Sequence, residues 1–183
     1  MHGYGSSDLA NAFRTVRKNT VQIAEDIPED KYDFVAASGV KSVRDILSHI
    51  AFAPMIQDDM HRVNRITTLK GFDFGALVGR TGVEEKKPRT KAQLVELLKA
   101  EGERFAKWLE SLTPEFLAET FTDQTGQTKR TRFESLLGPK EHEMHHRGQL
   151  MLIERLIGIV PHLTRQREEI VRQRQAAATK AGS

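Results

Sequence analysis

The sequence predicts an all-α protein built as a four-helix bundle. Four long segments repeat apolar residues at spacings of three and four, which is the period of an amphipathic helix. No segment alternates apolar and polar residues over the length of a strand. With 183 residues and no cysteine, the chain has the length of one ordinary domain and lacks both disulfides and thiolate metal ligands. Helices packed on helices are the simplest way to bury these stripes.

The first two predicted helices are separated by a connection that proline begins. The first helix starts near Leu9 and is stopped by Pro28. The second covers about residues 43–68, with Ser42 as a good N-cap. Pro54 lies inside this second helix. Because proline lacks an amide donor and clashes with the carbonyl four residues earlier, we expect a kink there.

The middle of the chain contains one further predicted helix between two irregular segments. Residues 71–88 contain glycines and charges without a periodic pattern, so the sequence predicts a loop. Thr90 is placed to cap a third helix over about 91–112. Residues 122–129, TDQTGQTK, have the composition of a turn.

The fourth predicted helix contains an internal glycine and proline. It starts near Thr131 and ends at about Leu156. The pair Gly138-Pro139 is expected to break or kink it, because proline is tolerated in a first helical turn but not in the middle. Within the tail, residues 162–183, the segment from Leu163 to about Ala178 could form a fifth and mostly polar helix.

The net charge divides the chain into a neutral bundle, residues 1–161, and a basic C-terminal tail, residues 162–183. The tail holds five basic and two acidic side chains and so accounts for the whole net charge of +3. A neutral body argues against nucleic-acid binding, which only the tail could support. The start of the chain has no apolar signal core, and no apolar run reaches the roughly 20 residues of a membrane span. We therefore expect a cytoplasmic protein without membrane contact.

Three of the seven histidines fall within five residues, at His142, His145 and His146. On a helix, His142 and His146 lie on the apolar face, one turn apart. Both imidazoles could therefore bind one divalent metal. His49 lies on a mostly apolar face of the second helix and could supply a third ligand. Three protein ligands leave a position for water or substrate, as in catalytic metal sites.

Simpler interpretations exist for the same residues. A single histidine on an apolar face is more often a hydrogen-bonded core residue, and this applies to His49 taken alone. His145 lies at the edge of the apolar stripe and could be an outer hydrogen-bond donor, a spare ligand or a surface residue. Asp45 and Gln149 are candidates to hold the second ring nitrogen of a ligand. Asp45 is more simply a helix-cap residue.

Two blocks of the sequence resemble one known family. The stretch HEMHHRGQLMLIERLIGIVP is similar to the C-terminal signature of the DinB family, the DinB/YfiT-like metalloenzymes, in which H-x-x-x-H-R-G-Q precedes an apolar helix, glycine and proline. SVRDILSHIAF resembles the earlier histidine block of that family. The resemblance covers roughly residues 7–161. The matching residues of the first block are His142, His146, Arg147, Gly148, Gln149, Gly158 and Pro161.

The resemblance implies a fold, a metal and a class of reactions. The fold is a four-helix bundle with up-down-down-up connections, extended here by the C-terminal helix or tail. The metal is held by three histidines, here His49, His142 and His146, and is zinc or nickel, with iron or manganese as alternatives. Dimers are common in the family, so the resemblance implies a homodimer. Some transfer low-molecular-weight thiols such as bacillithiol or use mycothiol in an isomerisation, and others are described as metal-dependent hydrolases.

Two functional hypotheses follow. In the first, the protein is a metal-dependent S-transferase or hydrolase that activates a metal-bound thiol or water against a small-molecule substrate, and the sequence identifies no catalytic side chain. Arg147 could then bind an anionic thiol cofactor, or instead pair with an acidic residue of a neighbouring helix. In the second, the protein is a non-catalytic dimeric helical module, and any metal is structural. Candidate walls of a substrate cleft are Phe52, Met55, Ile56, Met144 and Ile153.

Overall fold

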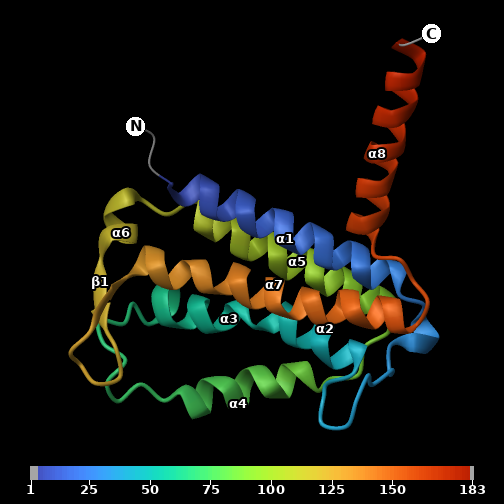
Figure 1. Cartoon of the computed structure of the whole chain (residues 1–183). Coiled ribbons are helices and arrows are strands. Elements are labelled where there is room, and N and C mark those ends of the chain that lie inside the picture. Colours follow the sequence, from blue (N-terminus) through green and yellow to red (C-terminus); the bar gives the residue numbers. More distant parts are fainter. Residues whose placement is uncertain (1–3, 182–183) are drawn as a thin grey trace.

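The computed structural model describes residues 4–181 and confirms the helical bundle (Figure 1). In Figure 1, α1 and α7 run in one direction, while α2 with its continuation α3, and α5, run in the opposite direction. This is the expected up-down-down-up arrangement. The bundle helices are α1 (Ser6–Asp26), α2 (Val43–Phe52), α3 (Pro54–Gln57), α5 (Lys91–Glu110) and α7 (Arg132–Leu156).

Shorter elements connect the bundle helices. β1 and β2 form an antiparallel hairpin around the predicted turn, with Phe121 opposite Arg130. Strands of three residues are too short for an alternating pattern, so the sequence did not predict them. These elements are a 3₁₀ turn η1 (Glu29–Lys31), a π-helical segment η2 (Asp58–Val63), α4 (Phe74–Glu85), α6 (Pro114–Ala118), β1 (Thr120–Thr122), β2 (Lys129–Thr131) and α8 (His162–Ala181).

The predicted helix caps are confirmed. The side chain of Ser42 accepts a hydrogen bond from the amide of Asp45 at the start of α2. Thr90 and Thr131 close capping boxes at the starts of α5 and α7. The helix α1 also ends where predicted, just before Pro28. Each cap satisfies amide groups that have no partner inside the helix.

The second helix is shorter and more irregular than predicted. Helical structure ends at Val63 rather than near residue 68, and Pro54 separates α2 from α3. Arg65 has a left-handed backbone with φ of 44°, which no helix can continue through. Thr68 then forms a parallel bridge with Thr122 of β1. Thr68 therefore pairs with β1, although the apolar period placed it in the second helix.

Of the break or kink predicted at Gly138-Pro139, the break is absent from the fourth helix. α7 is continuous through Pro139, which is buried. A proline inside a helix costs about 3 kcal/mol. Packing offsets this cost, because Leu136 and Leu150 of the same helix contribute to the two separate core clusters of the bundle.

Residues 71–88 are also not a loop, because most of them form α4. Asp73 caps this helix by accepting a hydrogen bond from the amide of Ala76. Leu77 and Thr81 are its buried residues, one turn apart. Three glycines inside α4 obscure this short stripe, since glycine is a poor helix former. α4 returns the chain along the outside of the bundle, so that α5 runs parallel to α2 (Figure 1).

A buried ion pair lies between the two core clusters and joins the four main helices. Arg17 of α1 donates through Nε to both carboxylate oxygens of Glu143 of α7, at 2.9 and 3.1 Å. Its Nη1 donates to the carbonyl of Leu98 in α5 at 2.8 Å, and its Nη2 to the carbonyl of Ile50 in α2 at 3.1 Å. The Ile50 carbonyl needs this donor, because Pro54 has no amide to offer it.

One glycine makes room for this guanidinium. A Cβ atom at Gly102 of α5 would lie 2.6 Å from Cγ and 2.9 Å from Nη1 of Arg17. Such distances are far below van der Waals contact. The absence of a side chain at residue 102 therefore allows Arg17 to cross between α1 and α5.

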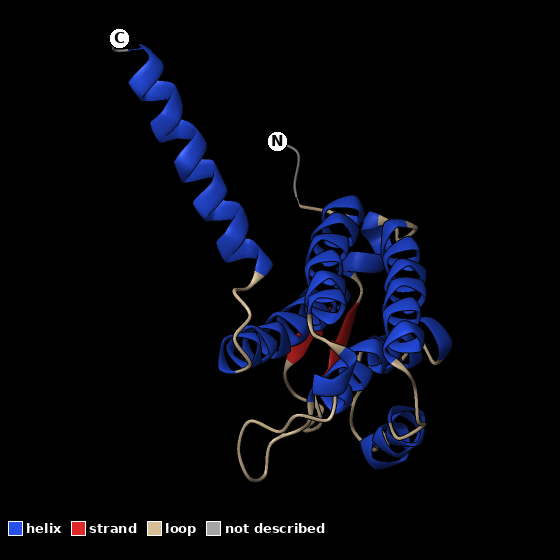
Figure 2. Ribbon diagram, turned by 90° about the vertical axis from the view of Figure 1, so that its right-hand side faces the viewer, coloured by secondary structure: helices blue, strands red, loops and turns tan. Residues whose placement is uncertain are grey.

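The C-terminal tail forms α8, as predicted, and this helix projects from the bundle (Figure 2). Its start is anchored where Arg165 pairs with Asp26 at the end of α1, at 2.5 Å. Across the described residues, no helix combines the length and the hydropathy needed to cross a bilayer. The division of the chain at residue 161 stays a prediction.

Candidate metal centre

Three imidazole nitrogens from two helices meet inside the bundle. The Nε2 atom of His142 lies 3.0 Å from Nε2 of His49 and 3.2 Å from Nε2 of His146. One ring nitrogen from each residue lies within 4.8 Å of the other two. Ligands held 2.0–2.1 Å from a tetrahedral metal are about 3.3 Å apart. The structure thus brings all three predicted ligands to a spacing that suits one ion.

The outer ring nitrogens of two histidines are held by acceptor oxygens. Nδ1 of His49 lies 2.8 Å from a carboxylate oxygen of Glu85, and Nδ1 of His146 lies 2.8 Å from the amide oxygen of Gln149. Because these oxygens only accept hydrogen bonds, both Nδ1 atoms carry the proton. The Nε2 lone pairs of His49 and His146 therefore face the centre of the cluster.

The third imidazole, His142, is held differently. Its Nδ1 is buried and has no hydrogen-bond partner among the described residues. Burial, together with the neighbouring His146 and His49, lowers the pKa of His142 to about 4. Burial also lowers the pKa of His146. Both rings are therefore neutral near pH 7, which is the form that binds a metal.

Glu85 is the site residue that the sequence prediction missed. Burial would raise the pKa of its carboxyl, but the hydrogen bond from His49 and the charge of Lys41 outweigh this and lower it. An ionised carboxylate is a strong acceptor for the imidazole. A signal for α4 did exist, since Leu77, Thr81 and Glu85 follow one another at intervals of four.

Of the two residues predicted to hold a second ring nitrogen, Gln149 contacts the cluster and Asp45 does not. Asp45 accepts a hydrogen bond from the hydroxyl of the N-cap residue Ser42 at 2.7 Å, so its carboxylate is engaged at the helix cap. Gln149 does reach the cluster, through His146. Its amide nitrogen lies 3.2 Å from Nε2 of His145. The exposed His145 therefore contacts Gln149 and orients its amide from outside.

Within residues 4–181, the side chain of Arg147 makes no hydrogen bond or ion pair, although its backbone is part of α7. Its charge contributes to lowering the pKa of His162, at the start of α8. It is not among the groups that shift the pKa values of His142 or His146. Its role in binding a cofactor stays a prediction.

A cavity of about 350 Å³ opens beside the histidine cluster. Of the candidate walls, only Ile153 lines it. Met144 is 44% exposed, and Phe52 and Met55 line a different cleft. The residues around the cavity are Ala36, Gly39, Val40, Lys41, Ile46, His146, Gln149, Leu152 and Ile153.

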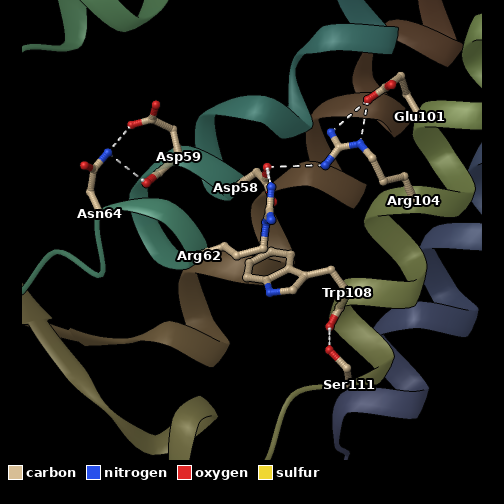
Figure 3. A network of polar contacts seen from close by, with 8 residues as sticks. All are labelled: Asp58, Asp59, Arg62, Asn64, Glu101, Arg104, Trp108 and Ser111. Carbon is tan, nitrogen blue, oxygen red and sulfur yellow. Dashed lines mark hydrogen bonds and ion pairs between the residues drawn. The ribbon is translucent and has the colours of Figure 1, made fainter.

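The second cleft, of about 470 Å³, is larger but contains a network of paired charges (Figure 3). Asp58 accepts from Arg62 at 2.5 Å and from Arg104 at 3.3 Å, and Arg104 also pairs with Glu101 at 2.8 Å. Burial would raise the pKa of Asp58, but the two arginines outweigh it and lower it. Asp58 is only 7% exposed. These side chains neutralise one another and tie η2 to α5.

His61 is a core histidine without a place in the cluster. Arg132 donates to its Nδ1 at 2.9 Å, so its Nε2 carries the proton and donates to the hydroxyl of Ser135 at 3.0 Å. Burial, with the nearby Arg132 charge, lowers the pKa of His61 to about 4. A fully buried ring with both nitrogens satisfied is structural.

The protein is thus a helical bundle of up-down-down-up type with a candidate metal centre of three imidazoles. The match to a family model is more specific, because the model of the DinB superfamily matches residues 12–150. The chain therefore belongs to the DinB superfamily. A search of curated proteins finds no matching relative.

Solved structures show the same fold. A DinB-like protein of Bacillus subtilis, YjoA, is 25% identical, with a TM-score of 0.59, and the match covers 82% of this chain and 92% of that protein. YfiT from Bacillus subtilis is 17% identical, with a TM-score of 0.67, over 87% of this chain and 91% of that protein. YfiT is described as a probable metal-dependent hydrolase with an unusual four-helix bundle topology.

Proposed function

We propose that this protein is a metal-dependent hydrolase in which His49, His142 and His146 hold the ion. The main support is the orientation of the cluster, since Glu85 and Gln149 turn two Nε2 lone pairs toward the third imidazole. Unshared electron pairs at this spacing repel one another unless a cation or a proton lies between them. The description of YfiT as a probable metal-dependent hydrolase supports the same reaction class.

The residues of the chain have separate tasks in this proposal. A bound divalent ion would supply Lewis-acid activation of water, or of a thiol. The three imidazoles occupy one side of the site and leave the other side open to a substrate. Glu85 holds the ring of His49 in place from α4, and Gln149 holds the ring of His146 within α7. Burial keeps His142 unprotonated.

Replacing His142 by alanine tests the ion itself. We expect the wild type to carry about one zinc or nickel ion per chain and the variant to carry almost none, since its two remaining ligands bind weakly. Elemental analysis after metal-supplemented expression measures this. The control is Glu141→Ala, which removes an exposed side chain next to His142 and should retain the metal. The proposal fails if the wild type carries no ion, or if His142→Ala retains it.

The same variants distinguish a functional metal from a structural one. A catalytic ion should leave the melting temperature nearly unchanged when it is lost with His142. In the alternative hypothesis, a non-catalytic module with a structural metal, the loss of the ion should lower the melting temperature markedly.

Removing the carboxylate of Glu85 should weaken metal binding without abolishing it. Loss of an outer hydrogen-bond partner typically lowers metal affinity about 10- to 100-fold. Competition with a chelator of known affinity measures the change in Glu85→Ala. The matched control is Glu84→Ala, which removes a neighbouring carboxylate that pairs with Lys87 and Arg89 instead. Equal affinities for Glu85→Ala and the wild type would show that α4 does not support the site.

Whether the substrate reacts with water or with a thiol distinguishes a hydrolase from an S-transferase. We expect the metal-loaded protein to cleave simple esters or amides without added thiol. A reaction that requires a low-molecular-weight thiol, and joins that thiol to the substrate, would instead support thiol transfer. The homodimer and the choice among zinc, nickel, iron and manganese stay predictions.

A further inference from the structure

The cavity beside the histidine cluster shares two residues with the candidate metal centre. His146 and Gln149 belong to both, because they line the cavity and are hydrogen-bonded to each other. A substrate whose reacting group lies at the three imidazoles would therefore place its remaining part in this cavity. The walls beyond these two residues determine what that part can be.

Those walls are apolar and offer few free polar groups. Ala36, Val40, Ile46, Leu152 and Ile153 supply the side chains. The amide of Gln149 is already engaged on both sides, by His146 and by His145. A sugar or another polyhydroxyl group would leave its hydroxyls without partners here, which is costly.

The mouth of the cavity exposes large apolar side chains to water. Leu152 is 59% exposed and Val40 is 49% exposed. Covering them with an apolar ligand would remove their surface from water. Lys41 is the one charged side chain among the described lining residues, and it already lies 3.9 Å from the carboxylate of Glu85. The described lining has no acidic side chain that would bind a cationic group.

We propose that this cavity binds an acyl or alkyl chain of the substrate and thereby selects substrates with an apolar, non-cationic body. The proposal rests on the hydrolase function proposed above, which requires the reacting group to be held at His49, His142 and His146. The second cleft does not compete for this role, since its side chains form mutual ion pairs.

A series of alkyl hydroxamates on the zinc-loaded protein tests the inference. The hydroxamate group chelates the metal in every member, and only the chain grows, from acetohydroxamate through butano- to hexanohydroxamate. Burial of one methylene is worth about 0.8 kcal/mol, which corresponds to an affinity gain of about fourfold for each added carbon. Titration calorimetry measures the dissociation constants.

Variants at the mouth localise the effect. Leu152→Asp should leave the affinity for acetohydroxamate unchanged and remove most of the gain with chain length. Val40→Asp, which alters a lining residue in a different segment of the chain, should do the same. The matched control is Leu156→Asp, which alters a leucine of α7 that is 57% exposed but does not line the cavity. This variant should keep the full dependence on chain length.

The outcomes separate the two proposals. If acetohydroxamate does not bind the metal-loaded protein, the metal-dependent function fails. If acetohydroxamate binds but longer chains bind no better, the function survives and the acyl-binding cavity is overturned. The cavity is also overturned if Leu152→Asp and Val40→Asp keep the wild-type gain, or if Leu156→Asp loses it.

Discussion

Replacing Glu143 by alanine is expected to destabilise the protein by about 3–5 kcal/mol, because it leaves a buried guanidinium without its counter-ion. The side chains of Arg17 and Glu143 are only 5% and 2% exposed. Urea denaturation followed by circular dichroism measures the free energy of unfolding. A loss smaller than about 1 kcal/mol would mean that water reaches Arg17 and replaces the carboxylate.

Two further variants make this result specific. Glu141→Ala removes an exposed carboxylate from the same helix and should change stability by less than about 0.5 kcal/mol. The double variant Arg17→Met, Glu143→Leu removes both charges and should be more stable than Glu143→Ala. It should not regain full stability, because the carbonyl of Ile50 then loses its donor from Arg17 while Pro54 still offers none.

Replacing Glu154 by leucine is expected to stabilise the protein at alkaline pH, by up to about 3 kcal/mol. Glu154 is fully buried, and neither carboxylate oxygen has a partner among the described residues. Burial, with the nearby charge of Asp26, raises the pKa of its carboxyl to about 7. Between the unfolded pKa of about 4.5 and pH 7, the unfolded chain releases this proton while the folded chain keeps it. Stability from this group is therefore lost as the pH rises.

The variant should thus differ most from the wild type at pH 8 and least at pH 4.5. Denaturation at both pH values gives the difference, and leucine's own packing contributes equally to both. Glu141→Leu, an exposed position of the same helix, should show no such dependence on pH. A Glu154→Leu variant whose advantage is the same at pH 4.5 and pH 8 would contradict the raised pKa.

The histidine cluster could be predicted because its signal is local. His142 and His146 are one turn apart, and His49 lies on the apolar side of another helix, so burying the two stripes turns the rings toward each other. The spacing also indicated Gln149, three residues from His146. The positions of the rings, and the 3.0 and 3.2 Å contacts between them, required the structure.

The supporting residues could not be predicted because their partners are distant in the sequence. Arg17 and Glu143 are 126 residues apart, and each is only a charge that interrupts an apolar stripe. Glu85 lies in a segment whose glycines lower the helix propensity. The segment nevertheless forms a helix, which packs on α2 and α3. Pro139 was also mispredicted from local sequence, because packing overrides the local preference of proline against a helix.

The placement of α4 has a consequence for how firmly an ion would be retained. This helix buries only Leu77 and Thr81, so detaching it requires far less free energy than unfolding the bundle. Each such local opening would separate Glu85 from His49 while α2 and α7 stay folded. The rate at which the site releases its metal would then follow fluctuations of one peripheral helix, and hydrogen exchange in residues 74–85 would report it.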